Sequence, residues 1–153
     1  MVSGTGTGRG PAAKRPGGAR APAKPAASRT AASKAWVPER QEVIWIDCNP
    51  QAGGEMRDLH PMLVLSPGAF NARTGLVIGL PMTTAAYNAT NPFALAVGAA
   101  GGRKTGKTSY VLCHQPKSFD WRARGAKRHA RGKLADATFA MACAMLNQII
   151  SIE

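Results

Sequence analysis

Acidic residues are scarce in this chain. Its 153 residues include 8 Asp and Glu against 20 Lys and Arg, which gives a formal net charge of +12. The eight acids are dispersed, and no group of carboxylates has the spacing of metal ligands, which argues against a two-metal hydrolytic site. No metal and no cofactor are expected.

Cysteines and long apolar runs are also few. Cys48, Cys113 and Cys143 are odd in number, widely spaced and set among apolar residues, which excludes a disulfide framework or a zinc cluster and predicts buried, reduced thiols. No stretch approaches the ~18 apolar residues of a membrane span, and the N-terminal region lacks the apolar segment of a secretory signal. We therefore expect a cytoplasmic protein without a membrane partner.

Residues 1–36 contain seven basic residues, no acidic residue, and little besides Gly, Ala, Pro, Ser and Thr. Such a segment cannot bury enough apolar surface to offset the entropy lost on ordering, so we predict a disordered basic tail. It is either a solvated extension or an arm that binds nucleic acid. Residues 37–153 form the predicted folded domain, with a net charge of only +5.

The folded part is rich in short segments with strand character, separated by Gly, Pro and Asn turns at the spacing of a small barrel. The expected strands are Glu42 to Cys48, Met62 to Ser66, Leu76 to Thr83, Phe93 to Val97 and Ser109 to Gln115. Apolar residues then recur at helical spacing from Leu134 to Ile149, with Met141 and Met145 on the buried face. The sequence predicts a mainly β, antiparallel barrel followed by one C-terminal helix.

Residues 101–108 have the spacing of a phosphate-binding P-loop, with Gly101, Gly106, Lys107 and Thr108 in the motif positions. A P-loop requires a helix directly after the Lys-Thr pair, so that backbone amides converge on phosphate. Here a strand is expected instead. We therefore reject nucleotide binding.

A further set of motifs points to one family. They are W-x-D-x-N-P from Trp45, G-G-E ending at Glu55, L-V-L-S-P, F-N-x-x-T-G, P-x-T-T, and a second block from Val111 to Arg128. Over about Pro38 to Ile150 the chain resembles the MazF/PemK toxins, ribonucleases of bacterial toxin–antitoxin pairs. The resemblance implies an SH3-like, CcdB/PemK-type barrel that forms a homodimer. It also implies a single-stranded RNA substrate, a cognate antitoxin, and cleavage to 2′,3′-cyclic phosphate and 5′-hydroxyl ends.

Two departures from the family pattern concern catalysis. Relatives carry a functional Arg before the Pro of the first long loop and a Thr after the third strand. Thr83 is kept, but His60 replaces the Arg, and the later Arg-x-Asp pair reads Leu112 and His114. Because imidazole titrates near neutrality, we hypothesise that His60, projecting from a loop, and His114 converge as base and acid, with Thr83 assisting. Alternatively, His114 is a half-buried residue hydrogen-bonded within the barrel.

Cations interleaved with aromatic residues after the fifth strand suit a surface that stacks bases and follows a phosphate backbone. The predicted RNA-binding residues are Arg57, Lys117, Trp121, Arg122 and Arg124, with Glu55 and Gln115 in support. Trp121 could equally pack in the core, Asp47 is expected to form a turn, and His129 is interpreted as part of a solvated basic face. Two alternatives remain: a CcdB-like toxin that binds gyrase without catalysis, and an RNA-binding member that no longer cuts.

Overall fold

The structure, a computed structural model, describes Gly4, residues 35–100 and residues 106–151. The chain divides into one unit of residues 1–34 and a second of residues 35–153. The predicted tail therefore lies almost wholly outside the described residues. Its predicted end at residue 36 is slightly late, because the ring of Trp36 packs edge-on against Trp121 at 6.1 Å and contacts the core.

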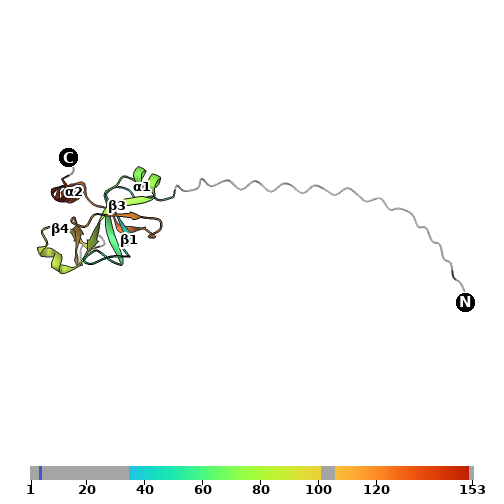
Figure 1. Cartoon of the computed structure of the whole chain (residues 1–153), viewed down its shortest axis with the longest axis horizontal. Helices are drawn as coiled ribbons and strands as arrows, with labels where there is room; N and C mark the ends of the chain where they lie inside the picture. The colour runs from blue at the N-terminus through green and yellow to red at the C-terminus, as the bar shows by residue number, and fades with distance from the viewer. Residues whose placement is uncertain (1–3, 5–34, 101–105, 152–153) are drawn as a thin grey trace. The chain divides into compact units, whose positions relative to one another are not determined.

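The second unit is a curled antiparallel sheet with a C-terminal helix (Figure 1). The strands are β1 Glu42–Asp47, β2 Leu59–Val64, β3 Leu76–Thr83, β4 Ala94–Ala99, β5 Thr108–Leu112, β6 Lys117–Asp120 and β7 Lys127–Lys133. Their order is β4-β5-β3-β2-β1-β7, and β6 also pairs with β3. The predicted architecture, a mainly β antiparallel barrel with a terminal helix, is confirmed as a half-barrel.

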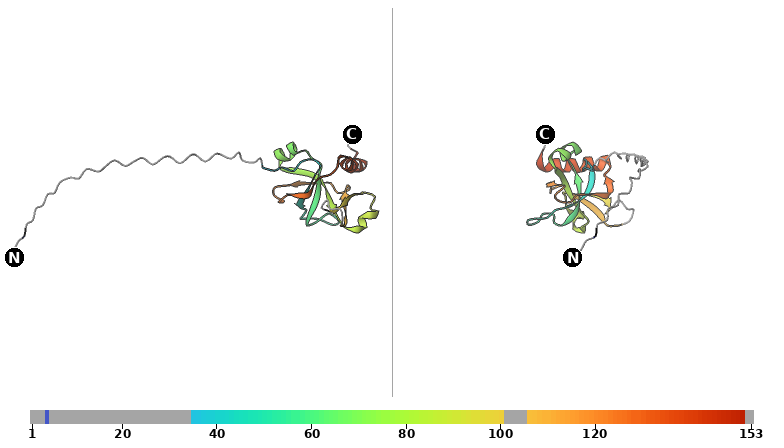
Figure 2. Two further views of the ribbon diagram at one scale, coloured as in Figure 1. Left: turned by 180° about the vertical axis from the view of Figure 1, so that it is seen from behind. Right: turned by 90° about the vertical axis from the view of Figure 1, so that its right-hand side faces the viewer.

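Three helical segments complete the unit: α1 Gly68–Thr74, η1 Ala86–Thr90 and α2 Asp136–Ile150. In Figures 1 and 2, α1 and α2 lie at one end of the curled sheet and η1 lies toward the other. No helix in the described residues is long and apolar enough to cross a membrane.

Both faces of β1, β2 and β3 are largely buried, which explains why these three strands contain nearly continuous apolar runs. Alternate residues of β1 enter different clusters: Val43 packs toward α2, whereas Ile44 and Ile46 pack with Trp121. Cys48 and Cys113 are buried in these clusters and Cys143 is half-buried, all as free thiols. The prediction of buried, unpaired cysteines is confirmed for the first two.

Asn71 explains the F-N-x-x-T-G motif. Its side chain is fully buried in α1, donates to the carbonyl oxygen of Pro38 at 2.8 Å, and accepts the Ser66 hydroxyl at 2.5 Å. Its backbone carbonyl accepts the indole N–H of Trp121 at 3.0 Å. Asn71 therefore ties α1 to the neighbouring Ser66 and to two distant segments, at Pro38 and Trp121. Gly75, in the left-handed region at φ 74°, then ends the helix.

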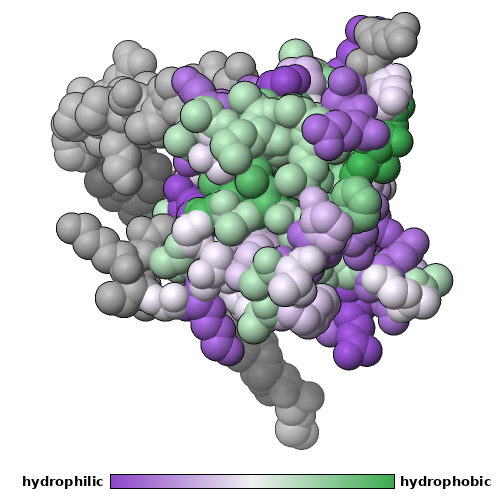
Figure 3. Space-filling view, turned by 90° about the vertical axis from the view of Figure 1, so that its left-hand side faces the viewer, coloured by the Kyte–Doolittle hydropathy of each residue, from purple (hydrophilic) through white to green (hydrophobic). Residues whose placement is uncertain are grey.

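The buried face of α2 differs in part from the predicted one. Phe139, Ala142 and Leu146 are buried, Met145 packs partly against them, and Met141 is 56% exposed. Figure 3 views the side of the unit on which α2 lies and shows apolar residues gathered over its upper part, bordered by polar ones. The helix was placed correctly, but Met141 does not belong to the core.

Four further features differ from the sequence-based expectation. Helix α1 was not predicted, and β6 and β7 were taken for a basic loop. Strand β2 begins at Leu59, so His60 lies within a strand rather than on a loop rim. The shift arises because Pro61 lies in the strand opposite Trp45, where the sequence suggested that the proline ended a loop.

Candidate active site

A cleft of about 590 Å³ opens where several strand ends meet. The start of β2, the end of β3, the end of β4 and the start of β5 all lie at this end of the antiparallel sheet. We call it the mouth cleft. The described residues that line it are Trp45, Leu59, His60, Pro61, Met82, Thr83, Thr84, Ala100, Gly106, Ser109, His129, Ala130 and Arg131. None of them is acidic.

His60 is the second residue of β2, and its Nδ1 lies 3.2 Å from the carbonyl oxygen of Met82. Because a carbonyl oxygen can only accept, Nδ1 carries the proton in the neutral ring. Nε2 then keeps its lone pair and can accept a proton. The strand pairing that joins Met62 to Pro81 brings His60 to the level of Thr83.

Thr83 ends β3 and is 8% exposed. Its Oγ1 accepts the backbone N–H of Ala85 at 3.2 Å, which fixes the hydroxyl oxygen while its own proton remains available to a ligand. The structure therefore brings His60 and Thr83, two of the three predicted catalytic residues, to one cleft.

The same cleft contains two residues whose roles the sequence did not indicate, His129 and Arg131 of β7. Nδ1 of His129 accepts the backbone N–H of Arg131 at 3.0 Å, and the imidazole packs on Trp45 with the ring centroids 4.8 Å apart. Burial lowers the pKa of His129, and the charge of Arg131 lowers it further. Strand alternation was the missed signal: once residues 127–133 are a strand, positions 129 and 131 share the inward face.

The guanidinium of Arg131 joins the two edge strands of the sheet, because Nη2 donates to the carbonyl oxygen of Val97 in β4. Nη1 is buried and has no hydrogen-bond partner among the described residues. Burial also lowers the pKa of Arg131. The interpretation of the segment around His129 as a solvated basic face is thus wrong for these two positions.

His114 lies elsewhere. It is exposed in the turn after β5, with its ring 5.9 Å from that of Phe93, and it lines a separate cleft of about 330 Å³ with Glu55, Gln115 and Lys117. Thr83 pairs with Tyr110, so residue 114 is at the opposite end of β5 from the mouth cleft. The hypothesis that His60 and His114 converge is therefore wrong within the described residues.

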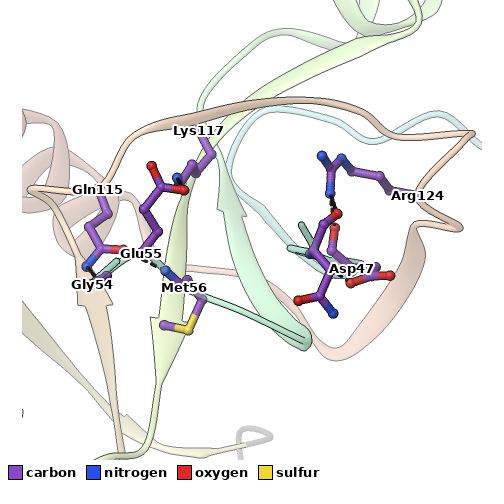
Figure 4. A network of polar contacts seen from close by, with 8 residues as sticks. Asp47, Gly54, Glu55, Met56, Gln115, Lys117 and Arg124 are labelled. Atoms are coloured by element: carbon purple, nitrogen blue, oxygen red, sulfur yellow. Dashed lines mark hydrogen bonds and ion pairs between the residues drawn. The ribbon is translucent and has the colours of Figure 1, made fainter. Parts of the chain in front are cut away.

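In this second cleft, Glu55 and Lys117 point toward one another (Figure 4), and Nζ of Lys117 lies 2.7 Å from Oε2 of Glu55. The hydrogen bond from Lys117 holds the pKa of Glu55 below its usual value. Gln115 accepts the backbone N–H of Met56 at 3.1 Å. The predicted supporting residues thus order the loop between β1 and β2.

Most of the predicted RNA-binding residues contact other side chains or backbone groups of the folded unit. Trp121 is 7% exposed and packs in the core, which confirms the alternative given for it and not base stacking; Arg122 lies over its ring at 4.3 Å. Arg124 lies 4.1 Å over Phe119 and donates to the carbonyl oxygen of Asp47 at 2.9 Å (Figure 4). Arg57 is exposed.

Two smaller predictions are confirmed. Oδ1 of Asp47 accepts the backbone N–H of Asn49 at 2.9 Å, the hydrogen bond of a turn-forming aspartate. Thr108 opens strand β5, not a helix, as expected when the P-loop was rejected; residues 101–105 lie outside the described part. In that part, no group of three His, Cys, Asp or Glu residues is placed to hold a metal ion.

Comparison with known proteins shows the family of the chain. Residues 39–150 match the family described as PemK-like, MazF-like toxins of type II toxin–antitoxin systems. The chain belongs to this family. It is 33% identical over 115 residues to the endoribonuclease toxin MazF of Escherichia coli K12, and the aligned region covers 75% of this chain and 96% of that protein.

The chain is also 37% identical over 94 residues to the endoribonuclease PemK of Escherichia coli, which covers 61% of the chain and 68% of that protein. Among solved structures, MazF from Deinococcus radiodurans matches with a TM-score of 0.68 and 30% identity, over 77% of this chain and all of that one. The resemblance to MazF/PemK toxins that the sequence motifs indicated is confirmed.

Proposed function

We propose that this toxin-family protein is a metal-independent endoribonuclease that cuts single-stranded RNA by attack of the RNA's own 2′-hydroxyl. The observation that carries the proposal is the hydrogen bond between Nδ1 of His60 and the carbonyl oxygen of Met82. It leaves Nε2 as a base in a cleft with the Thr83 hydroxyl and no acidic lining residue. The family membership and the relatives' names support the same activity.

In the proposed reaction, Nε2 of His60 removes the proton of the 2′-hydroxyl. The ribose oxygen attacks phosphorus, the O2′–P bond forms, and the P–O5′ bond breaks while the leaving oxygen takes a proton from water; the His60 imidazolium then returns its proton to solvent. The products are a 2′,3′-cyclic phosphate and a 5′-hydroxyl end. The Thr83 hydroxyl donates to a phosphate oxygen that gains charge in the transition state.

Binding of the RNA strand beyond the cleft would fall to exposed cations such as Arg57, whose 3.8 Å ion pair with Asp58 is open to water, whereas Lys117 is engaged by Glu55 at 2.7 Å. As a type II toxin it would act in the cytoplasm and be inhibited by a cognate antitoxin, whose acidic or apolar segment would cover the basic cleft. We further propose a homodimer. The exposed apolar side chains of α2, Met141, Ile149 and Ile150, support an interface of this kind without locating it.

The test is to incubate the full-length protein with mixed RNA in EDTA and to map the new 5′ ends. Defined cuts with 5′-hydroxyl ends are expected, and a single 2′-deoxy sugar on the 5′ side of the cut should abolish cleavage. Efficient cutting of the deoxy substrate would mean that water attacks, and the mechanism would be wrong. Intact RNA together with inhibited gyrase would favour a CcdB-like toxin instead.

A further inference from the structure

Arg131 is an unusual lining residue of the mouth cleft because its positive charge has no counter-ion. No carboxylate lines the cleft, and neither ion pair found among the described residues involves Arg131. One amino group of the guanidinium is satisfied by the carbonyl of Val97, but Nη1 is buried without a partner. The Arg131 side chain is half-buried, and a charge that is partly removed from water without a counter-ion or a full set of hydrogen bonds costs folding free energy, so such a group is commonly retained for a ligand.

His129 supplies a second donor beside this charge. Because its Nδ1 accepts the backbone N–H of Arg131, the neutral ring must carry its proton on Nε2. Protonating Nδ1 would set two N–H groups against each other. His129 is therefore held as a neutral imidazole with an Nε2–H donor, the opposite tautomer to that of His60. Nε2 of His129 has no hydrogen-bond partner in the part of the chain that the structure describes.

We propose that Arg131 and His129 form a phosphate-binding subsite in the mouth cleft, which holds the scissile phosphodiester against His60 and Thr83. The inference rests on the proposed function for its substrate. Nη1 of Arg131 and Nε2 of His129 donate to the two non-bridging oxygens, a geometry for which a planar guanidinium is well suited. Nη1 is shielded from water, so the subsite requires a small turn of the Arg131 side chain toward the entering phosphate.

This arrangement separates two tasks within one cleft. His60, with a free lone pair, accepts the proton, whereas His129 and Arg131 only donate and so stabilise charge on phosphate. It also accounts for the replacement of the family's loop Arg by His60, because β7 then supplies the guanidinium that the loop lacks. If Arg131 had only a structural role, the hydrogen bond from Nη2 to Val97 would be sufficient for it. That role would not explain why Nη1 of Arg131 and Nε2–H of His129 are both donors without a partner among the described residues.

The first test uses inorganic phosphate and does not depend on RNA cleavage. In the full-length protein, nitrogen NMR should show His129 with its proton on Nε2. Addition of phosphate should then shift the His129 and Arg131 signals, while sodium chloride at equal ionic strength should not. Arg131→Gln should weaken phosphate binding about 10-fold or more, the loss expected for one charge-assisted hydrogen bond. Arg128→Gln removes an equal charge from the opposite face of the same strand, where Arg128 lies over Trp36, and should have no effect on phosphate binding.

Because Arg131 also joins β4 and β7, Arg131→Gln could unfold the protein. Arg131→Lys keeps a cation and a donor for Val97 but loses the second amino group, and His129→Gln keeps a side-chain donor near the position of Nε2. Thermal melting should first show that both variants are folded. The kcat of RNA cleavage should then fall on the order of 10²-fold in Arg131→Lys and much less in His129→Gln. His129→Phe, which has no donor, should be the more impaired of the two His129 variants.

The outcomes separate this inference from the proposed function. Phosphate binding that depends on Arg131, in a protein that cuts no RNA, would support the subsite and overturn the ribonuclease. Normal RNA cleavage by folded Arg131→Lys and His129→Phe would overturn the subsite and leave the ribonuclease intact. A His129 proton on Nδ1, or phosphate shifts equal to those with chloride, would also overturn the subsite.

Discussion

The side-chain oxygen of Gln115 accepts the backbone N–H of Met56 at 3.1 Å and ties the loop between β1 and β2 to the segment that follows β5. The side-chain amide of Gln115 also reaches the carbonyl oxygen of Gly54, at 3.4 Å, and Lys117 pairs with Glu55 between them. Three consecutive loop residues are thus held by two side chains that are 59 or more residues away in sequence. The loop's order depends on these contacts.

Gln115→Ala should loosen this loop without unfolding the protein. A net hydrogen bond contributes about 1 kcal/mol, so hydrogen exchange of the Met56 amide should become roughly fivefold faster. Glu55→Gln is the matched control, and it should change the exchange rate little because its ion pair with Lys117 is partly exposed to water. Unchanged exchange in Gln115→Ala would mean that other contacts order the loop.

His60 and His114 lie in different clefts, so the effects of replacing each on RNA cleavage can be compared directly. His60→Ala should lower the RNA cleavage rate on the order of 10²-fold, because it removes the base, and Thr83→Val should also impair turnover. His114→Ala, which alters a residue in the other cleft, should retain nearly full activity. Cleavage rates under single-turnover conditions provide the measurement. An inactive His114→Ala with an intact fold would restore His114 to the catalytic group.

His129 should make stability sensitive to acid. Burial holds the pKa of His129 in the folded protein below the ordinary histidine value of 6.5, so the unfolded chain binds the proton first as pH falls. Stability should therefore be highest above about pH 6.5 and fall below it, until His129 is also protonated in the folded state. His129→Gln should reduce this loss, measured as the change in urea midpoint between pH 7.5 and pH 5. An equal loss in both proteins would assign the acid sensitivity to other groups.

The sequence predicted the strands that carry apolar runs, because burial of both sheet faces leaves a signal that is local in the chain. It could not predict β6 and β7, whose residues 117–120 and 127–133 are largely polar or charged. They become strands only because β3 and β1 offer unpaired edges. The position of His129 and Arg131 depends on that pairing, so the cleft could not be assembled from motifs alone.

A similar argument explains which site residues were predicted. Thr83 lies in a motif that the family shares, and His60 stands directly before the proline of another shared motif, so both were found from local sequence. The sequence left Trp121 between RNA binding and the core because cations surround it in sequence, whereas its indole N–H bonds to Asn71, 50 residues away. Contacts at that separation leave no local pattern.

Cys113 should be chemically inert in the folded protein. Burial raises the pKa of its thiol to about 11, with a smaller contribution from Cys143. At pH 8 it is therefore protonated, and a thiol reacts with iodoacetamide only as the thiolate. Mass spectrometry should find Cys113 unmodified in the native protein and modified after unfolding, with the half-buried Cys143 intermediate. Rapid native labelling of Cys113 would show that the core around it opens readily.

Trp36 defines where the folded unit begins, and this can be tested by truncation. Its ring packs on Trp121 at 6.1 Å, and Arg128 lies over it at 5.5 Å. Removal of residues 1–34 should leave the melting temperature essentially unchanged. Trp36→Ala in the same truncated chain should cost roughly 1–3 kcal/mol, less than a fully buried Trp, and lower the melting temperature by about 4–12 °C. Differential scanning calorimetry would measure both changes. A large drop on removal of residues 1–34 alone would show that the tail packs on the folded unit, whereas no drop for Trp36→Ala would place the start of the core after Trp36.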